Sequence, residues 1–220
     1  FIQRFRPQMV GIGPFIPHKD TPFAHEKTGT LEMTLKLIAL LRLMLPEFYL
    51  GKCDEAAATR EIQQTMRRCL DDGVFRTVPH SLVLVQRTLP GGAVRCGIVG
   101  ALDLEAPDSV TPIRATEGTV ASRLPARVRI RAAAALEMPH IMVFYSDPED
   151  TIRREAQAAA GETLYDFDLM SGGGHVRGLR IAGAKADALA ARLCATGVGT
   201  DGAHPMRFAI ADGNHSLAAA

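Results

Sequence analysis

The last residues of the chain have the types and the spacing of an anion-binding turn. An apolar run over residues 206–211 leads into Asp212, Gly213, Asn214, His215 and Ser216, and an alanine-rich segment follows. This order predicts a strand, a tight turn over residues 212–216 and a helix that starts at Leu217. At a helix N-terminus, free backbone N–H groups and the helix dipole attract anions. His215 and Ser216 have donors for a phosphate oxygen, and the carboxylate of Asp212 can hold a metal ion or orient a hydroxyl group. The alternative is an Asx-type turn in which Asn214 is left-handed and His215 only packs, and the spacing alone favours this second interpretation.

A second group of chemically active side chains lies within residues 113–119. Arg114 has a guanidinium that can hold a phosphate through two parallel hydrogen bonds, and Glu117 can act as a base or as a metal ligand. Thr116 adds a hydroxyl group between them. The alternative is a capped turn whose charges face solvent.

A third group combines two carboxylates with a histidine. Asp166 and Asp168 precede three consecutive glycines, residues 172–174, and His175 follows them. Glycine-rich loops let a backbone approach a ligand closely, but most are simply mobile connections. We therefore expect a loop at this position.

Turn and capping signals divide the chain into helices and strands. Helices are predicted over residues 31–45, from Asp54 to Gly73, from Asp147 to about Ala160 and over residues 184–195, and strands over residues 9–16, 82–88, 94–102, 140–145, 176–181 and 206–211. Pro90, Gly91 and Gly92 predict a β-hairpin. Residues 123–131 alternate basic and apolar side chains, so we expect the solvated face of a strand there. The pattern predicts a mixed α/β (α+β) fold, in which helices flank a mixed sheet.

Composition excludes several classes of protein. The 220 residues, 47% of them hydrophobic, suffice for one or two domains with a buried core. A net charge of +1 lacks the basic footprint of a nucleic-acid-binding protein. The apolar run 35–45 contains Lys36 and Arg42 and is too short to cross a bilayer, so no membrane partner is expected. Four widely spaced cysteines predict reduced thiols, a cytoplasmic location and no metal site, and no feature of the sequence sets an oligomeric state.

The N-terminal segment resembles one known family. Residues 9–23, Glu26, Lys27 and residues 35–42 resemble the radical S-adenosylmethionine maturase of [FeFe]-hydrogenase, the HydE type. The resemblance implies that residues 1–44 are a late βα unit of a (β/α)8 barrel. It also implies S-adenosylmethionine and a 4Fe–4S cluster in the parent enzyme, but this sequence has no CxxxCxxC motif to hold a cluster. Because one βα unit cannot close a barrel of eight, radical chemistry is implied for the parent and not for this fragment.

The remainder of the chain is similar to a different family. From about residue 45 to Ala220 it is similar to the bacterial family known as domain of unknown function 1015. The matching segments are residues 45–47, 49–51, 72–75, 100–105, 113–119, 123–131, 136–140, 164–175 and 212–218. The two resemblances overlap in residues 41–46, which implies a chimera of two parts, residues 1–44 and residues 45–220, with the second part truncated.

The turn at Asp212–Ser216 also resembles a motif of nucleotide-binding domains. It is similar to the Asp-Gly-His-His-Arg element of ParB and sulfiredoxin-like domains, which include archaeal free-serine kinases. The resemblance implies phosphoryl transfer from a nucleotide with magnesium, or binding of a phosphorylated small molecule. The implied catalytic residues are Glu117, Asp212 and His215, and the implied ligand-binding residues are Arg114, Thr116, Gly213, Asn214 and Ser216. Ser216 replaces the arginine of those domains, which removes a bidentate phosphate donor.

Three functions of different classes follow from these patterns. The first is a nucleotide-binding or phosphotransferase-like domain, expected to be an incomplete and inactive fragment. The second is a fragment of a radical maturase without its cluster-binding cysteines. The third is a non-catalytic binding or structural domain whose loops only resemble active sites.

Overall fold

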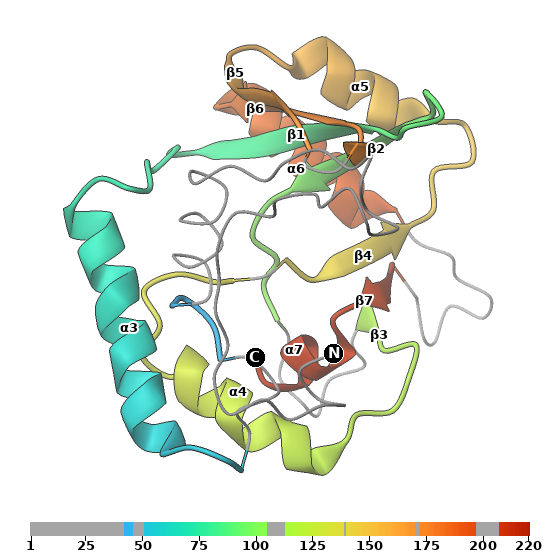
Figure 1. Cartoon of the computed structure of the whole chain (residues 1–220). Coiled ribbons are helices and arrows are strands. Elements are labelled where there is room, and N and C mark those ends of the chain that lie inside the picture. Colours follow the sequence, from blue (N-terminus) through green and yellow to red (C-terminus); the bar gives the residue numbers. More distant parts are fainter. Residues whose placement is uncertain (1–41, 46–50, 105–112, 139, 170–171, 197–206) are drawn as a thin grey trace, which may run out of the picture. The chain divides into compact units, whose positions relative to one another are not determined.

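The structure is a computed structural model of the chain, and it describes six segments (Figure 1). They are residues 42–45, 51–104, 113–138, 140–169, 172–196 and 207–220. The described residues form two compact units. The first comprises the described parts of Phe1–Arg76, Thr119–His140 and Ala218–Ala220, and the second those of Thr77–Gly118 and Ile141–Leu217.

Helix α3 (Glu55–Asp71) is the main element of the first unit, and its two ends lie where the sequence predicts them. The Asp54 carboxylate accepts a hydrogen bond of 3.0 Å from the backbone N–H of Ala57, which satisfies one of the free donors of the first turn. At the other end Gly73 adopts a φ of +68°, a conformation that glycine reaches without steric cost. Ile62 and Met66, one turn apart, are buried as predicted.

The basic stretch 123–131 is helical, so the prediction of a strand was wrong. A 3-10 turn, η2 (Ala121–Arg123), leads into helix α4 (Leu124–Arg131), which has Pro125 at its start. Proline at the first turn of a helix loses no hydrogen bond, and its fixed φ suits the helix. Ala126 is buried and Ile130 packs beside α3, so the apolar side chains follow the four-residue spacing of one helix face.

The core of the first unit lies between α3 and α4, which are drawn in cyan and yellow-green in Figure 1. Leu43, from the short described segment before α3, is buried with Ile62 and Met66. Gln63 donates to the carbonyl oxygens of Arg129 and Ile130 at 3.0 Å each, which satisfies two acceptors at the end of α4. The hydrogen bonds of Gln63 and the apolar contacts of the core thus hold α3 and α4 together.

The second unit contains a four-stranded antiparallel sheet in the order β2-β1-β6-β5. Its strands are β1 (Ser81–Thr88), β2 (Val94–Val99), β5 (Thr163–Asp168) and β6 (His175–Ala182). The predicted hairpin is confirmed, with Gly92 at a φ of +82° in its turn. Strand β5, which the sequence analysis missed, pairs with β6 in a second hairpin.

Two helices supply the core of this sheet. Helices α5 (Thr151–Ala159) and α6 (Ala184–Ala195) bury Ile152, Ala156 and Leu189 in one cluster with Leu84 of β1 and Ile181 of β6. Leu84 and Ile181 point to the same face of the sheet, because the register pairs Leu84 with Leu179 and Leu82 with Ile181. Both helices therefore pack on a single face.

A smaller three-stranded sheet in the order β3-β7-β4 also belongs to the second unit. Its strands are β3 (Ile113–Arg114), β4 (Met142–Tyr145) and β7 (Phe208–Asp212). The central strand β7 runs parallel to β3 and antiparallel to β4. Helix α7 (Asn214–Ala218) follows β7 after a single glycine, so the predicted order of strand, turn and helix is confirmed, but the helix begins at Asn214 and not at Leu217.

The mixed α+β fold class is confirmed, and the described residues form no closed barrel. The predicted N-terminal βα unit lies outside the described residues, apart from a turn at residues 42–44. All four cysteines are free thiols. None of the helices in the described part of the chain is long and apolar enough to cross a membrane.

The core of the four-stranded sheet can be tested at Leu84, which is 1% exposed. We expect Leu84→Ala to lower the free energy of unfolding by about 2–5 kcal/mol, because the substitution removes buried surface and leaves a cavity. Val94→Ala on β2, where the side chain is 56% exposed, is the control and changes the unfolding free energy by about 0.5 kcal/mol or less. Urea unfolding followed by circular dichroism measures both, and equal losses contradict this assignment of the core.

Candidate functional site

The carboxyl ends of the parallel strands β3 and β7 meet at one edge of the three-stranded sheet. Ile113 pairs with Phe208 and Arg114 with Ala209, so the residues that follow both strands emerge side by side. They belong to two motifs that the sequence analysis treated separately, residues 113–119 and residues 212–216. In open sheets with parallel strands, this edge is where ligands most often bind.

Two side chains join these motifs directly. The backbone N–H of Thr116 donates to Oδ1 of Asn214 at 3.0 Å, and Nδ2 of Asn214 donates to the Thr116 hydroxyl oxygen at 3.2 Å. The hydroxyl in turn donates to the carbonyl oxygen of Ile210 at 2.7 Å. Asn214 is 4% exposed, so its amide depends on these partners. The pair therefore fixes the backbone after β3 against the start of α7.

The turn between β7 and α7 requires glycine. Gly213 has a φ of +100°, which L-residues with a side chain rarely adopt, and the nearest atoms to a Cβ at this position belong to Ile141 at 3.4 Å. Its carbonyl oxygen accepts the first helical hydrogen bond, from the N–H of Leu217 at 2.9 Å. Asn214 is consequently the first residue of α7 and not the left-handed residue that the alternative interpretation expected.

The remaining predicted residues surround this pair. Arg114 is half-buried on β3, Glu117 is exposed after it, and Asp212 is exposed at the end of β7. His215 and Ser216 are half-buried in the first turn of α7. Arg114, Glu117, Asp212 and Ser216 form no side-chain hydrogen bond with any described residue, and His215 already has a partner. The edge thus combines a guanidinium, two carboxylates and a hydroxyl group that are free to meet a ligand.

The carboxylates and the histidine of the third predicted group lie on two paired strands, and the three glycines lie in the connection between them. Asp166 and Asp168 lie on β5, opposite Arg177 and His175 of β6. Nδ1 of His175 contacts Oδ1 of Asp168 at 2.8 Å, and Nε2 contacts Oδ1 of Asp166 at 2.5 Å. The carboxylates of Asp168 and Asp166 accept hydrogen bonds from the His175 ring, and these bonds raise the pKa of His175 above its usual range. Both ring nitrogens are engaged, so the group is a surface ion cluster.

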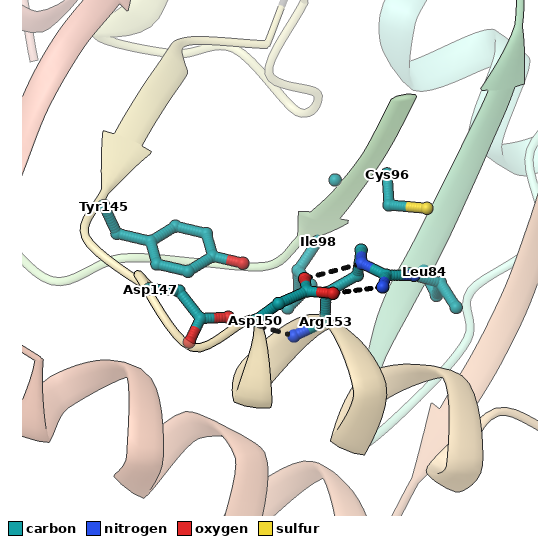
Figure 2. A pocket seen from close by; sticks show the side chains of 8 residues that line it. Leu84, Cys96, Ile98, Tyr145, Asp147, Asp150 and Arg153 are labelled. Atoms are coloured by element: carbon teal, nitrogen blue, oxygen red, sulfur yellow. Dashed lines mark hydrogen bonds and ion pairs between the residues drawn. The ribbon is translucent and has the colours of Figure 1, made fainter. Parts of the chain in front are cut away.

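A pocket of about 210 Å³ in the second unit was not predicted from the sequence (Figure 2). It lies beside the end of β4 and the start of α5, and Leu84, Ile98 and Cys96 form its strand side. Figure 2 shows the Arg153 guanidinium joined to the Asp150 carboxylate, with Tyr145 and Asp147 nearby. The spacing of Asp147, Asp150 and Arg153 by three residues is the sequence signal that could have indicated it.

The charged groups of this pocket already have partners within the protein. Asp147 accepts hydrogen bonds at 2.9 Å from the backbone N–H groups of Thr151 and Ile152, so it caps α5. Desolvation of the Asp147 carboxyl raises its pKa, but the hydrogen bonds from Thr151 and its neighbours lower it more. The pKa of Asp147 therefore lies below its usual value. The hydrogen bond with Arg153 lowers the pKa of Asp150. The pKa of Tyr145 is raised, mainly by burial and to a smaller extent by the negative charge of Asp147. Asp147, Asp150 and Arg153 thus stabilise the N-terminal end of α5.

The fold and the edge at β3 and β7 define a mixed α/β protein with a polar strand-turn-helix site. A family model described as "Protein of unknown function (DUF1015)" matches residues 34–220, and the chain belongs to this family. The match begins upstream of residue 45, the boundary predicted between the two parts, and includes every residue of the predicted site.

A second similarity concerns a much shorter stretch. The chain is 55% identical over 47 residues to the [FeFe] hydrogenase maturase subunit HydE of Thermotoga maritima. This match covers 21% of the chain and spans only 14% of the length of HydE. The two matches show a chain that combines a DUF1015 part with a HydE-like part. No solved structure matches this chain.

The joint between Thr116 and Asn214 can be tested by removing one hydroxyl group. We expect Thr116→Val to destabilise the protein by about 1–3 kcal/mol, because the Asn214 amide and the Ile210 carbonyl each lose a partner. Thr116→Ser keeps the hydroxyl and serves as the matched control in urea unfolding. If the valine variant is as stable as the serine variant, the pair does not hold the edge together.

The ion cluster on β5 and β6 predicts a pH dependence. Because the pKa of His175 is raised in the folded protein, its contribution to stability is complete below the usual histidine pKa of 6.5 and is lost as pH rises through the folded pKa. The stability difference between the wild type and His175→Gln should therefore be largest between about pH 5 and 6.5, where both carboxylates are ionised, and shrink above that range. An NMR titration should also show a lower His175 pKa in Asp168→Asn, and an unchanged value contradicts the cluster.

Proposed function

We propose that the edge formed by β3, β7 and α7 binds the phosphate groups of a nucleotide. The observation that carries the proposal is the joint between Thr116 and Asn214, which brings the Arg114–Glu117 segment beside the Asp212–Ser216 turn. Arg114 and Ser216 supply donors for phosphate oxygens, and the backbone N–H groups at the start of α7 add to them. The resemblance of this turn to the ParB and sulfiredoxin-like element supports the same ligand.

The two free carboxylates suit a magnesium nucleotide. Asp212 and Glu117 carry hard oxygen ligands, which Mg²⁺ prefers, and both are exposed at the edge. In phosphoryl transfer the oxygen of an acceptor hydroxyl attacks the terminal phosphorus, the bond to the leaving nucleotide breaks, and a base receives the hydroxyl proton. We assign the role of base to Glu117, and the roles of orienting metal and phosphate to Asp212 and His215.

Ser216, where the similar domains have an arginine, weakens the expected affinity of this site for phosphate. Serine gives one hydrogen bond where an arginine gives a bidentate, charged contact, so Arg114 is the guanidinium left to neutralise phosphate. We therefore propose binding as the activity of this chain and phosphoryl transfer as the reaction class of the site. A radical reaction is not proposed, because the sequence has no CxxxCxxC motif for the cluster.

Thermal unfolding with and without ligand tests the proposal. We expect ATP with magnesium, and inorganic tripolyphosphate, to raise the melting temperature, since a ligand that binds only the folded state stabilises it by mass action. Asp212→Ala and His215→Ala should abolish the rise. Asp103→Ala removes the same side chain as Asp212→Ala at an exposed position outside the candidate site and should retain the rise. No shift with either ligand in the wild type rejects the proposed function.

A further inference from the structure

The three-stranded sheet has one buried face and one open face. Ile113 of β3 and Ile210 of β7 are buried at 6% and 1% exposure. The side chains of β4 alternate, so that Val143 and Tyr145 are half-buried whereas Met142 and Phe144 are 55% and 64% exposed. A phenylalanine this exposed gains little from folding, since most of its surface stays in water. Burial in the core therefore does not explain its position.

The register places Phe144 in line with the candidate phosphate donor. Phe144 pairs with Ala209 on one side, and Ala209 pairs with Arg114 on the other. Residues paired in register point to the same face of a sheet, so the phenyl ring, the alanine methyl group and the guanidinium share the open face. Because neighbouring strands lie roughly 4.8 Å apart, the Cα atoms of Phe144 and Arg114 are about 10 Å apart across the small alanine.

The row of Phe144, Ala209 and Arg114 matches the order of base, sugar and phosphate in a nucleotide. An exposed aromatic ring offers a surface on which a base can stack, alanine leaves room above the sheet, and the guanidinium attracts phosphate. The register irregularity between Met142 and Val143 leaves Ala211 without a partner on β4, just before the turn at Gly213. Such a bulge bends a strand, and here it precedes the start of α7.

We infer that Phe144 is the stacking platform for the base of the nucleotide whose phosphates lie at Arg114 and the Asp212–Ser216 turn. This inference rests on the proposed function and adds a base site to it. The ligand is then a nucleoside polyphosphate and not a free polyphosphate, because Phe144 contributes only where a base is present.

Other exposed aromatic side chains do not share this arrangement. Tyr165 and Phe167 on β5 lie 6.0 Å apart between ring centroids, and Tyr165 covers Gly178, where a Cβ would come within 2.2 Å of its ring. They belong to the four-stranded sheet. Phe167, 50% exposed, is therefore a matched control for Phe144.

Calorimetric affinities of the whole protein for ATP with magnesium and for tripolyphosphate test the inference. We expect Phe144→Ala to weaken ATP binding on the order of 10-fold to 100-fold and to leave tripolyphosphate binding unchanged, because only ATP has a base to stack. Phe167→Ala should leave both affinities unchanged. Phe144→Trp keeps an aromatic surface and should keep ATP affinity within a few-fold of the wild type.

The two ligands separate the possible failures. If neither binds the wild type, the proposed function fails and the base site fails with it. If both bind but Phe144→Ala weakens neither, or weakens both equally, the phosphate site stands and the base platform is overturned. Loss of ATP binding in Phe144→Trp as large as in Phe144→Ala also overturns it, because stacking is then not the interaction.

Discussion

The geometry of the polar edge depends on one buried amide. Asn214 must satisfy both its oxygen and its nitrogen away from water, and Thr116 supplies a backbone donor and a hydroxyl acceptor for them. The left-handed Gly213 is what lets the chain reverse so that the amide reaches Thr116. Arg114, Glu117 and Asp212 consequently project from backbone positions that are already fixed. A site built this way loses little conformational entropy in the backbone when a ligand arrives.

Local signals in the sequence predicted most of the elements. Asp54 before α3, the proline and glycines of the hairpin, and the alanine-rich α6 each determine structure within a few residues, and each prediction is confirmed. The errors came from ambiguous periodicity. In α4 the four-residue spacing of Ala126 and Ile130 determines the structure, although the basic and apolar residues also alternate as in a strand. In β5 the alternation of Tyr165 and Phe167 with aspartates is a strand pattern, but the aspartates alone were considered, as candidate functional residues.

The candidate site was predictable in its parts and not in its assembly. Both polar motifs were identified from residue types, but no local signal indicates that Thr116 and Asn214 form a pair, because their contact depends on the pairing of β3 with β7. The pocket at Tyr145 and Arg153 combines local and distant residues. Its charged side chains are close together in the sequence, but Leu84, Cys96 and Ile98 of β1 and β2 form its other side, and a single sequence carries no direct record of that contact.

The order of strands in the larger sheet also bears on how the chain folds. The hairpins β1–β2 and β5–β6 each close over a short loop, whereas the pairing of β1 with β6 joins residues 81–88 to residues 175–182. Closing a long loop costs chain entropy before the contacts that stabilise it can form. Proteins dominated by contacts between residues far apart in the sequence therefore fold slowly. We therefore expect the two hairpins to form early and the docking of β1 on β6 to limit the rate of folding. Until then, the edges of both hairpins expose unpaired backbone groups, so the slow step is also the period in which the protein is most prone to aggregate.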